Sequence, residues 1–319
     1  MTRKEYTFDA GYQPQVRAYR GTQQIMRDVI IALLPAVVIG VWQFGVSSLI
    51  PVCTSILACV FFEWAYRKLL HKTGSIDDLS AVVTGMLLAF NVPVGMPIWE
   101  LLVGDIAAII LVKMLFGGLG CNFMNPALVG RIVIMFSFTT DMTTYAVPRI
   151  ANAIVSGGAD AVSTATPLTM MDQIGWADFP KLLLGAHGGV IGEVCAAALI
   201  VGGIYLIVRK VIKPIIPLCY LGSLLLFSWL FGGAQPVLSL FAGGVMLGAI
   251  FMATDYVTSP FTNKGKVIFG IGCGLITAAI RVFGNYAEGV TFAILLMNIL
   301  VPYINDLTMT KPLGGAVEK

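Results

Sequence analysis

Charged side chains are scarce in this sequence. Asp, Glu, Lys and Arg together make up 12% of its 319 residues, whereas hydrophobic residues make up 57%. Soluble globular domains carry about 25% charged residues. Because so few charges do not suffice to cover a water-soluble globule, the composition excludes that class and predicts a polytopic membrane protein. The net charge of +3 is too small to indicate a nucleic-acid partner, and we expect none.

Histidine and paired cysteine are scarce as well. The two histidines, His71 and His187, are too few for a pair of haem ligands or a histidine-rich metal site. The six cysteines lie in or beside apolar stretches and form no C-x-x-C pair. A buried free cysteine usually behaves as a small hydrophobe. We therefore expect no metal site, no disulfide framework and no iron–sulfur cluster ligated by this chain.

Apolar runs, by contrast, fill the chain. A membrane-spanning helix needs roughly 20 apolar residues, and about 17 is the lower limit. Ten stretches approach this length and predict an all-α membrane protein. They cover residues 28–46, 50–66, 79–93, 98–115, 124–138, 188–208, 214–231, 236–254, 267–282 and 289–304. The third and fifth are short, and short or interrupted spans in the two halves of a chain point to a site near the membrane midplane.

The chain also repeats itself weakly. Residues 85–91 resemble residues 248–255, and each segment is followed by a proline-containing turn, an apolar span and a Phe-Gly pair. Each half then holds five spans, and an odd number inverts the second half in the membrane. The predicted organisation is therefore two five-helix inverted repeats. Its parts are an N-terminal segment 1–27, a first repeat 28–138, a loop 139–187, a second repeat 188–304 and a tail 305–319.

The distribution of basic residues predicts the orientation of these spans. With both termini in the cytoplasm, 16 of the 20 Lys and Arg residues lie on the cytoplasmic side. Cytoplasmic loops of membrane proteins carry an excess of Lys and Arg, and the opposite orientation breaks this rule at nearly every loop. We therefore expect the loop 139–187 to be extracytoplasmic.

That loop holds a cluster of hydroxyl side chains around Thr166. The sequence there reads Asp160-Ala161-Val162-Ser163-Thr164-Ala165-Thr166-Pro167-Leu168. Pro167 disfavours an α conformation at the residue before it, so the Thr166 hydroxyl is expected on an extended backbone. These residues alone leave two interpretations open. The segment is an ordinary extramembrane loop or helix cap, or it is a functional site at Thr166.

A second polar turn separates the fourth and fifth spans and reads Asn122-Phe123-Met124-Asn125-Pro126. Asn125 is a suitable N-cap, and Pro126 is a suitable first residue, for the helix that follows. Alternatively, the amides of Asn122 and Asn125 face a ligand, because helix N-termini inside membranes often do so. The two interpretations are compatible.

Charged groups within the spans are costly, and each is a functional hypothesis by default. The candidates for a Na⁺ or H⁺ pathway are Asp105, Glu193 and Asp255. As the alternative, Asp105 and Glu193 pair with Arg131 in a structural contact. Glu63 and Arg281 lie near span ends, where long side chains reach out of the membrane.

Two of these segments carry a resemblance to a known family. Residues 160–168 resemble the flavinylation motif D-[AG]-x-[ST]-x-A-T-P-L. That motif belongs to a family of membrane proteins shared by Na⁺-translocating NADH:quinone reductase, as its B subunit, and the Rnf complex, as its D subunit. Residues 116–128 look like the F-G-G-x-G-x-N-x-x-N-P-A segment of the same family. The resemblance covers nearly the whole chain, and the short N-terminal segment favours the Rnf branch. Thr164 departs from the commoner motif, which has glycine there.

The resemblance implies a covalently bound cofactor. A flavin transferase would join FMN through its phosphate to the hydroxyl of Thr166, with Asp160, Ser163 and Ala165 as parts of the recognised motif. Asp160 would steer the Mg²⁺ that the transferase uses, or accept the hydroxyl proton of the threonine during attachment. Alternatively, it is an ordinary loop carboxylate. The resemblance also implies a non-covalent riboflavin, for which Asn122 and Asn125 are the candidate ligands.

The resemblance further implies a function and a location. The chain would be one subunit of a ferredoxin:NAD⁺ oxidoreductase in a prokaryotic plasma membrane, passing electrons through FMN and coupled to Na⁺ or H⁺ transport. Its partners would be the Rnf subunits A, B, C, E and G, the flavin transferase and membrane lipid. It would have no catalytic residues of its own. The alternative class is a solute channel or secondary transporter, because an inverted repeat also suits that class.

Overall fold

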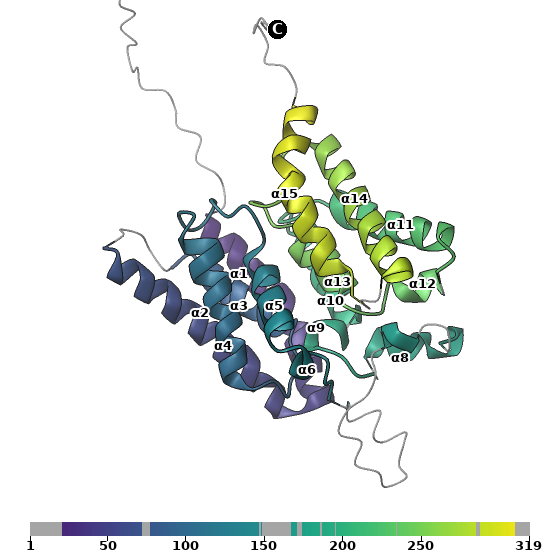
Figure 1. Cartoon of the computed structure of the whole chain (residues 1–319), viewed down its shortest axis with the longest axis horizontal. Coiled ribbons are helices and arrows are strands. Elements are labelled where there is room, and N and C mark those ends of the chain that lie inside the picture. The colour runs from purple at the N-terminus through teal and green to yellow at the C-terminus, as the bar shows by residue number, and fades with distance from the viewer. Residues whose placement is uncertain are drawn as a thin grey trace, which may run out of the picture.

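The computed structural model describes residues 21–71, 77–146, 148, 167–170, 174–185, 187–194, 196–233, 235–284 and 288–309. Every regular element within these ranges is helical, as the composition and the apolar runs predicted. The helices of the first half lie on the left of Figure 1, and those of the second half lie on the right.

The first half begins with two long helices and continues with shorter ones. Its elements are α1 (Thr22–Phe44), the 3-10 turn η1 (Val46–Ser48), α2 (Leu49–Leu69), α3 (Ser80–Ala89), α4 (Ile98–Ile106), the π-helix η2 (Ala107–Met114), α5 (Pro126–Ser137) and α6 (Thr139–Met142). The π-helix directly continues α4, so the two form one rod.

The second half begins with short elements and ends with two long helices. Its elements are η3 (Pro167–Met170), η4 (Trp176–Asp178), α8 (Phe179–Leu184), α9 (Ile191–Val194), α10 (Ala196–Val208), α11 (Ile215–Leu230), α12 (Pro236–Ser239), α13 (Val245–Leu247), the π-helix η5 (Gly248–Met252), α14 (Asn263–Phe283) and α15 (Val290–Thr308). The short helices α6 and α8 lie at the lower end of Figure 1, opposite the C-terminal end of α15.

Within the described part of the chain, four helical segments are long and apolar enough to cross a membrane: Thr22–Phe44, Val46–Leu69, Asn263–Phe283 and Val290–Thr308. Two predicted spans are much shorter as helices, since α3 has 10 residues and α5 has 12. A helix that crosses alone needs roughly 20 residues. The predicted span 236–254 is broken into α12, α13 and η5.

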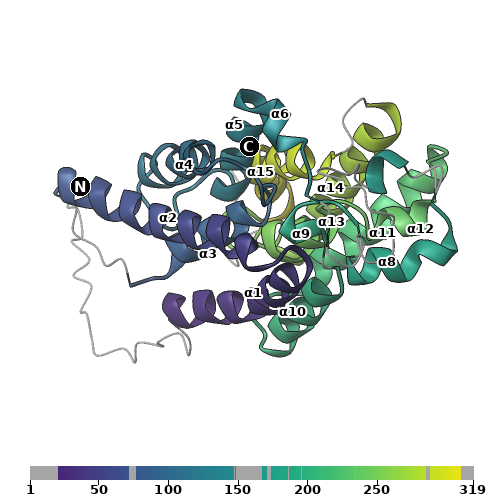
Figure 2. The same ribbon diagram turned by 90° about the horizontal axis from the view of Figure 1, so that it is seen from below.

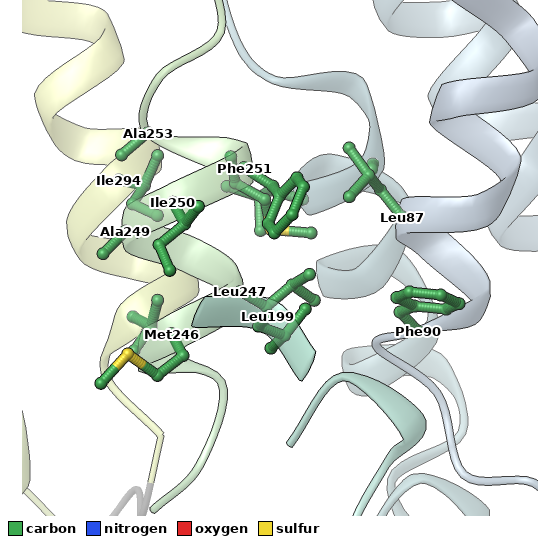
Figure 3. Packing of buried hydrophobic residues seen from close by; sticks show 14 of the residues in the cluster. Leu87, Phe90, Leu199, Met246, Leu247, Ala249, Ile250, Phe251, Ala253 and Ile294 are labelled. Carbon is green, nitrogen blue, oxygen red and sulfur yellow. The ribbon is translucent and has the colours of Figure 1, made fainter. Parts of the chain in front are cut away.

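The two halves meet where α3 ends, opposite α13 and η5 (Figure 3). Figure 3 shows Leu87 and Phe90, at the end of α3, facing Leu247 and Phe251 of the second half. The amide of Gly192 donates a hydrogen bond to the carbonyl of Phe90 across this contact, at 2.9 Å. Irregular backbone at membrane depth is tolerated only where neighbouring protein satisfies its polar groups. The break after α3 is therefore made possible by the second half.

Small residues bring the two halves into close contact. Helices α1 and α10 pack side by side (Figure 2). A Cβ atom added to Gly202 of α10 would lie 2.2 Å from the carbonyl oxygen of Ala32 in α1. Helices in membranes associate through such close backbone approach, because lipid supplies no hydrophobic driving force.

Candidate functional site

A cavity of about 780 Å³, its open mouth included, lies among the ends of α1, α3, η2, α10 and η5. Its walls are mainly apolar and include Val83, Leu87, Leu206 and Phe251. The polar side chains on its wall are those of Ser80, Thr84, Lys113, Asn122, Asn125, Thr254, Asp255 and Tyr256. Sites for small molecules typically have apolar walls and a few convergent polar groups, and this lining has both.

Asn125 caps α5, as the sequence predicted. Its Oδ1 accepts hydrogen bonds from the backbone amides of Ala127, at 3.1 Å, and Leu128, at 3.4 Å. Its Nδ2 donates to the carbonyl oxygen of Met252 at 3.3 Å, so the same side chain joins the two halves. The hydrogen-bonding groups of Asn125 are thus largely occupied by the protein.

Asn122 is different, because its buried Oδ1 has no hydrogen-bond partner among the described residues. The side chain is 8% exposed and lines the cavity. A buried acceptor without a partner costs about 1–3 kcal/mol. Its position therefore favours a donor supplied by a molecule in the cavity, and the structure separates the roles of the two asparagines.

Three glycines shape the turn that precedes Asn122. Gly117, Gly118 and Gly120 have φ angles of 122°, 97° and 90°. Residues with a side chain rarely adopt such angles. The F-G-G-x-G part of the segment is therefore needed to turn the chain at the cavity.

Asp255 also lines the cavity. Its Oδ2 accepts a hydrogen bond from the Thr258 hydroxyl at 3.2 Å, and its Oδ1 lies 3.5 Å from the amide of Val257. The structure therefore brings Asp255 together with Asn122 and Asn125, a grouping that the sequence did not predict.

Asp105 lies apart from the cavity, between α4 and α2. Its Oδ1 accepts hydrogen bonds from the hydroxyl of Ser55, at 2.5 Å, and the thiol of Cys59, at 3.2 Å. Its Oδ2 is buried and has no partner within the described part of the chain. The interpretation that Asp105 pairs with Arg131 is wrong, because its bonded partners are a serine and a cysteine.

Arg131 instead joins the two halves. One guanidinium nitrogen, Nη1, donates to Asn91 Oδ1 at 2.9 Å and to the Thr291 hydroxyl at 3.1 Å. The other, Nη2, pairs with Glu288 and lies 3.9 Å from Glu193. The predicted pairing of Glu193 with Arg131 is confirmed.

Three charged groups expected near the membrane surface lie inside the helix bundle: Lys113 and Glu63 are buried, and Arg281 is half-buried. Lys113, counted on the cytoplasmic side at the end of the predicted span 98–115, lies in η2 and pairs with Glu63 at 2.6 Å. Arg281 donates to the carbonyl oxygens of Ser239, at 2.7 Å, and Ala242, at 3.0 Å. Neither Glu63 nor Arg281 reaches out of the membrane as expected. Glu63 also pairs with Arg67 one helical turn away, but its contact with Lys113 spans 50 residues and the contacts of Arg281 span at least 39, so local patterns gave no signal for these long-range partners.

The predicted attachment residue Thr166 and its neighbours Asp160, Ser163 and Ala165 lie outside the described residues. The C-terminal end of the motif is described: Pro167 is buried, and Leu168 packs against a small core of Leu182, Leu238 and Ala242.

Leu168 also lies beside the glycine at the break between α12 and α13. A Cβ atom added to Gly243 would lie 3.2 Å from Leu168 Cδ2 and 3.0 Å from Arg281 Nη2. At the same end of the bundle, burial raises the pKa of Tyr145 to about 12, and the negative charge of Glu193 adds to this effect. The end of the motif is thus anchored on the second half, near buried charged groups.

A pair of alanine variants distinguishes the two asparagines. Asn125→Ala removes a cap, which contributes about 1 kcal/mol, and the bond to Met252, which contributes about 1 kcal/mol more. We expect a lower unfolding temperature of the purified protein. Asn122→Ala is expected to leave that temperature nearly unchanged and to lower the content of non-covalent flavin. Equal loss of stability in both variants would contradict this assignment.

Comparison with known proteins places the chain in one family. Residues 10–314 match the NQR2, RnfD, RnfE family. The chain is 43% identical to the D subunit of the Na⁺-translocating ferredoxin:NAD⁺ oxidoreductase complex of Acetobacterium woodii, over 97% of this chain and 96% of that protein. It is 38% identical to the D subunit of the proton-translocating ferredoxin:NAD⁺ oxidoreductase complex of Clostridium ljungdahlii, over 98% and 97% of the two chains. The resemblance inferred from the motifs is confirmed, and this chain belongs to the NQR2, RnfD, RnfE family.

Proposed function

We propose that this chain is the D subunit of an ion-translocating ferredoxin:NAD⁺ oxidoreductase complex and that it carries FMN in phosphoester linkage on Thr166. The observation that carries this proposal is the motif at residues 160–168, in a chain whose relatives are named as this subunit. The chain acts as one part of the complex and not as a stand-alone enzyme.

The residues that follow Thr166 fit a tether. Pro167 is buried and Leu168 packs on the second half, so the chain is held directly after the attachment residue. The small side chain of Ala165 leaves room for the flavin transferase at the hydroxyl. FMN, when bound, supplies the electron chemistry, and the protein supplies its position and electrostatic surroundings.

The lining of the cavity at Asn122 supports the proposal of a second, non-covalent flavin. Its apolar walls suit the faces of a flat ring, and the unpartnered Oδ1 of Asn122 suits an N–H donor at the ring edge. Asn125 shapes the wall through its contact with Met252. Riboflavin is the ligand that we propose there.

The complex would move Na⁺ or H⁺, and the buried carboxylates of this chain are candidates for part of the path. Asp105 has an unpartnered oxygen, Asp255 faces the cavity, and Glu193 is held near Arg131. The relatives named above include one that translocates Na⁺ and one that translocates protons. The partners would be the Rnf subunits A, B, C, E and G and the flavin transferase.

The architecture that we propose is two five-helix inverted repeats in the plasma membrane. Equivalent helices pack in the same order in both halves, since α4 contacts α2 and α5, and α14 contacts α11 and α15. A solute transporter is the rival function for such an architecture.

Mass spectrometry of the purified complex tests the proposal. A proteolytic peptide that contains residues 159–168 should carry the added mass of FMN on Thr166. Flavin released from the precipitated protein should be riboflavin. A peptide without added mass in a complex active in electron transfer would overturn the tether and favour the rival function.

Cysteine labelling tests the orientation. In a variant without native cysteines, Trp176→Cys should react with a membrane-impermeant maleimide added to intact cells, whereas Lys210→Cys should react only after permeabilisation. Both positions are exposed in the structure, so differences in burial do not explain a difference in labelling. Labelling of position 210 in intact cells would reverse the orientation.

A further inference from the structure

We propose that Asp78, Ser80 and Lys113 form a proton-delivery chain from the surface of the protein to the cavity, with Glu63 holding the lysine in place. The proposal deepens the function proposed above, because it rests on a redox-active molecule in the cavity.

The proton-delivery chain is continuous in the structure. Lys113 Nζ donates a hydrogen bond to Ser80 Oγ at 2.5 Å, and Ser80 Oγ donates to Asp78 Oδ1 at 2.6 Å. The amide of Ser80 also donates to Asp78 Oδ1 at 2.9 Å, which fixes the carboxylate at the start of α3. Three side chains from two parts of the sequence therefore link by two hydrogen bonds without a gap.

The two ends of the proton-delivery chain, Lys113 and Asp78, lie in different surroundings. Lys113 and Ser80 line the cavity, and Lys113 is 1% exposed. The side chain of Asp78 is 17% exposed, at the end of the bundle where α2 ends. One end therefore faces the bound molecule, and the other reaches water.

The charges around the chain are balanced. Glu63 of α2 pairs with Lys113 at 2.6 Å and with Arg67, and Arg67 lies 4.0 Å from Asp78. The four charged side chains carry two positive and two negative charges. A buried lysine without a counter-charge would be strongly destabilising. Glu63 thus allows a lysine to remain at the cavity wall, and it is a positioning residue.

The step conserves protons. As electrons arrive in the cavity, an N–H bond at Lys113 Nζ breaks and the proton passes to the molecule bound there. The carboxylate of Asp78 takes a proton from water, and the Ser80 hydroxyl turns so that it accepts a hydrogen bond from this carboxyl and donates one to the neutral amine of Lys113. The Ser80 proton then moves to Lys113 as the Asp78 proton moves to Ser80, so one proton crosses per cycle and each side chain returns to its starting state. The electrons come from the other subunits of the complex.

The test measures proton uptake by the purified complex after rapid reduction, with a pH-indicator dye in weakly buffered solution. Lys113→Met is expected to slow uptake by roughly 100-fold, the lower end of what a positioned proton donor contributes. Asp78→Asn is expected to slow uptake as well, and added azide or another small weak acid should restore it. The pH dependence of the reduction potential of the non-covalent flavin should be unchanged in Asp78→Asn, because a delivery path sets the rate of proton uptake and not its equilibrium.

Lys68→Met is the matched control. Lys68 also lies near the end of α2 but stacks over Trp64, outside the chain. Uptake rates in Lys113→Met and Asp78→Asn equal to that of Lys68→Met would overturn the proton chain. Non-covalent flavin is measured in every sample, and its absence from the unmodified complex would overturn both the second flavin and the chain. If Lys113→Met fails to assemble, Asp78→Asn decides, since its side chain lies at the surface.

Discussion

Thr166→Ala is expected to lose all ultraviolet-excited flavin fluorescence from its band in a denaturing gel, while the protein inserts and folds nearly normally. The substitution removes the hydroxyl that the phosphoester requires. The neighbouring anchor of Pro167 and Leu168 packs through its own side chains, so it should survive. Electron transfer through this subunit should stop. Gel fluorescence and the intact mass of the protein check the first effect, and turnover of the assembled complex checks the second.

Three further variants show whether the position is specific. Ser163→Ala and Thr164→Ala should keep the flavin, and Thr164→Gly should match or exceed the unmodified yield, because glycine is commoner there in the motif. Every flavinylated variant should require co-expression of a flavin transferase. FMN mass on Thr164 instead of Thr166 would contradict the assignment.

Arg131→Met is expected to cause the largest loss of stability among single substitutions at the charged residues. Removing one partner from a buried ion pair costs about 3–5 kcal/mol, because the remaining charge stays buried without compensation. Here Glu193 and Glu288 would lose their cation, and Asn91 and Thr291 would lose a donor. Unfolding in detergent, followed by helical circular dichroism, measures the effect.

Two controls separate the loss of buried contacts from the loss of charge. Arg131→Lys keeps the charge but not the planar fork of donors, so an intermediate loss is expected. Lys181→Met breaks an exposed pair with Asp178 and should cost at most about 1 kcal/mol. If Arg131→Met is as mild as Lys181→Met, the guanidinium does not join the two halves.

The all-helical class was predictable, because apolar runs are local features of a sequence. The cap at Asn125 was predictable for the same reason, since the Asn-Pro pair alone specifies a helix start. The break inside the span 236–254 was not predicted. Gly243-Gly244 is a local signal for this break, and Gly243 has a φ of 68° there. The hydrogen bonds that Arg281 of α14 donates to the carbonyls of Ser239 and Ala242 have no local signal, because that residue lies 42 and 39 positions after them.

Most contacts of the buried charged side chains were not predictable either, because they join residues far apart in the sequence. Lys113 was counted on the cytoplasmic side, at the end of the predicted span 98–115, from the distribution of basic residues. Its burial depends on Glu63, fifty residues earlier. The cavity likewise combines Asn122 with Asp255 of the other half, and no spacing in a single sequence indicates that they meet.

The close contact of α1 with α10 helps to distinguish a secondary transporter from an electron-transfer subunit. Secondary transporters commonly work by rocking one half against the other. Here Gly202 lets α10 approach the backbone of α1, and Arg131 bridges both halves through bonds that rocking would break. Such a frame keeps the separation between the cavity and the anchored end of the motif constant. A fixed separation is a handicap for carrying solutes, and it is an advantage for passing electrons, whose transfer rate falls steeply with distance.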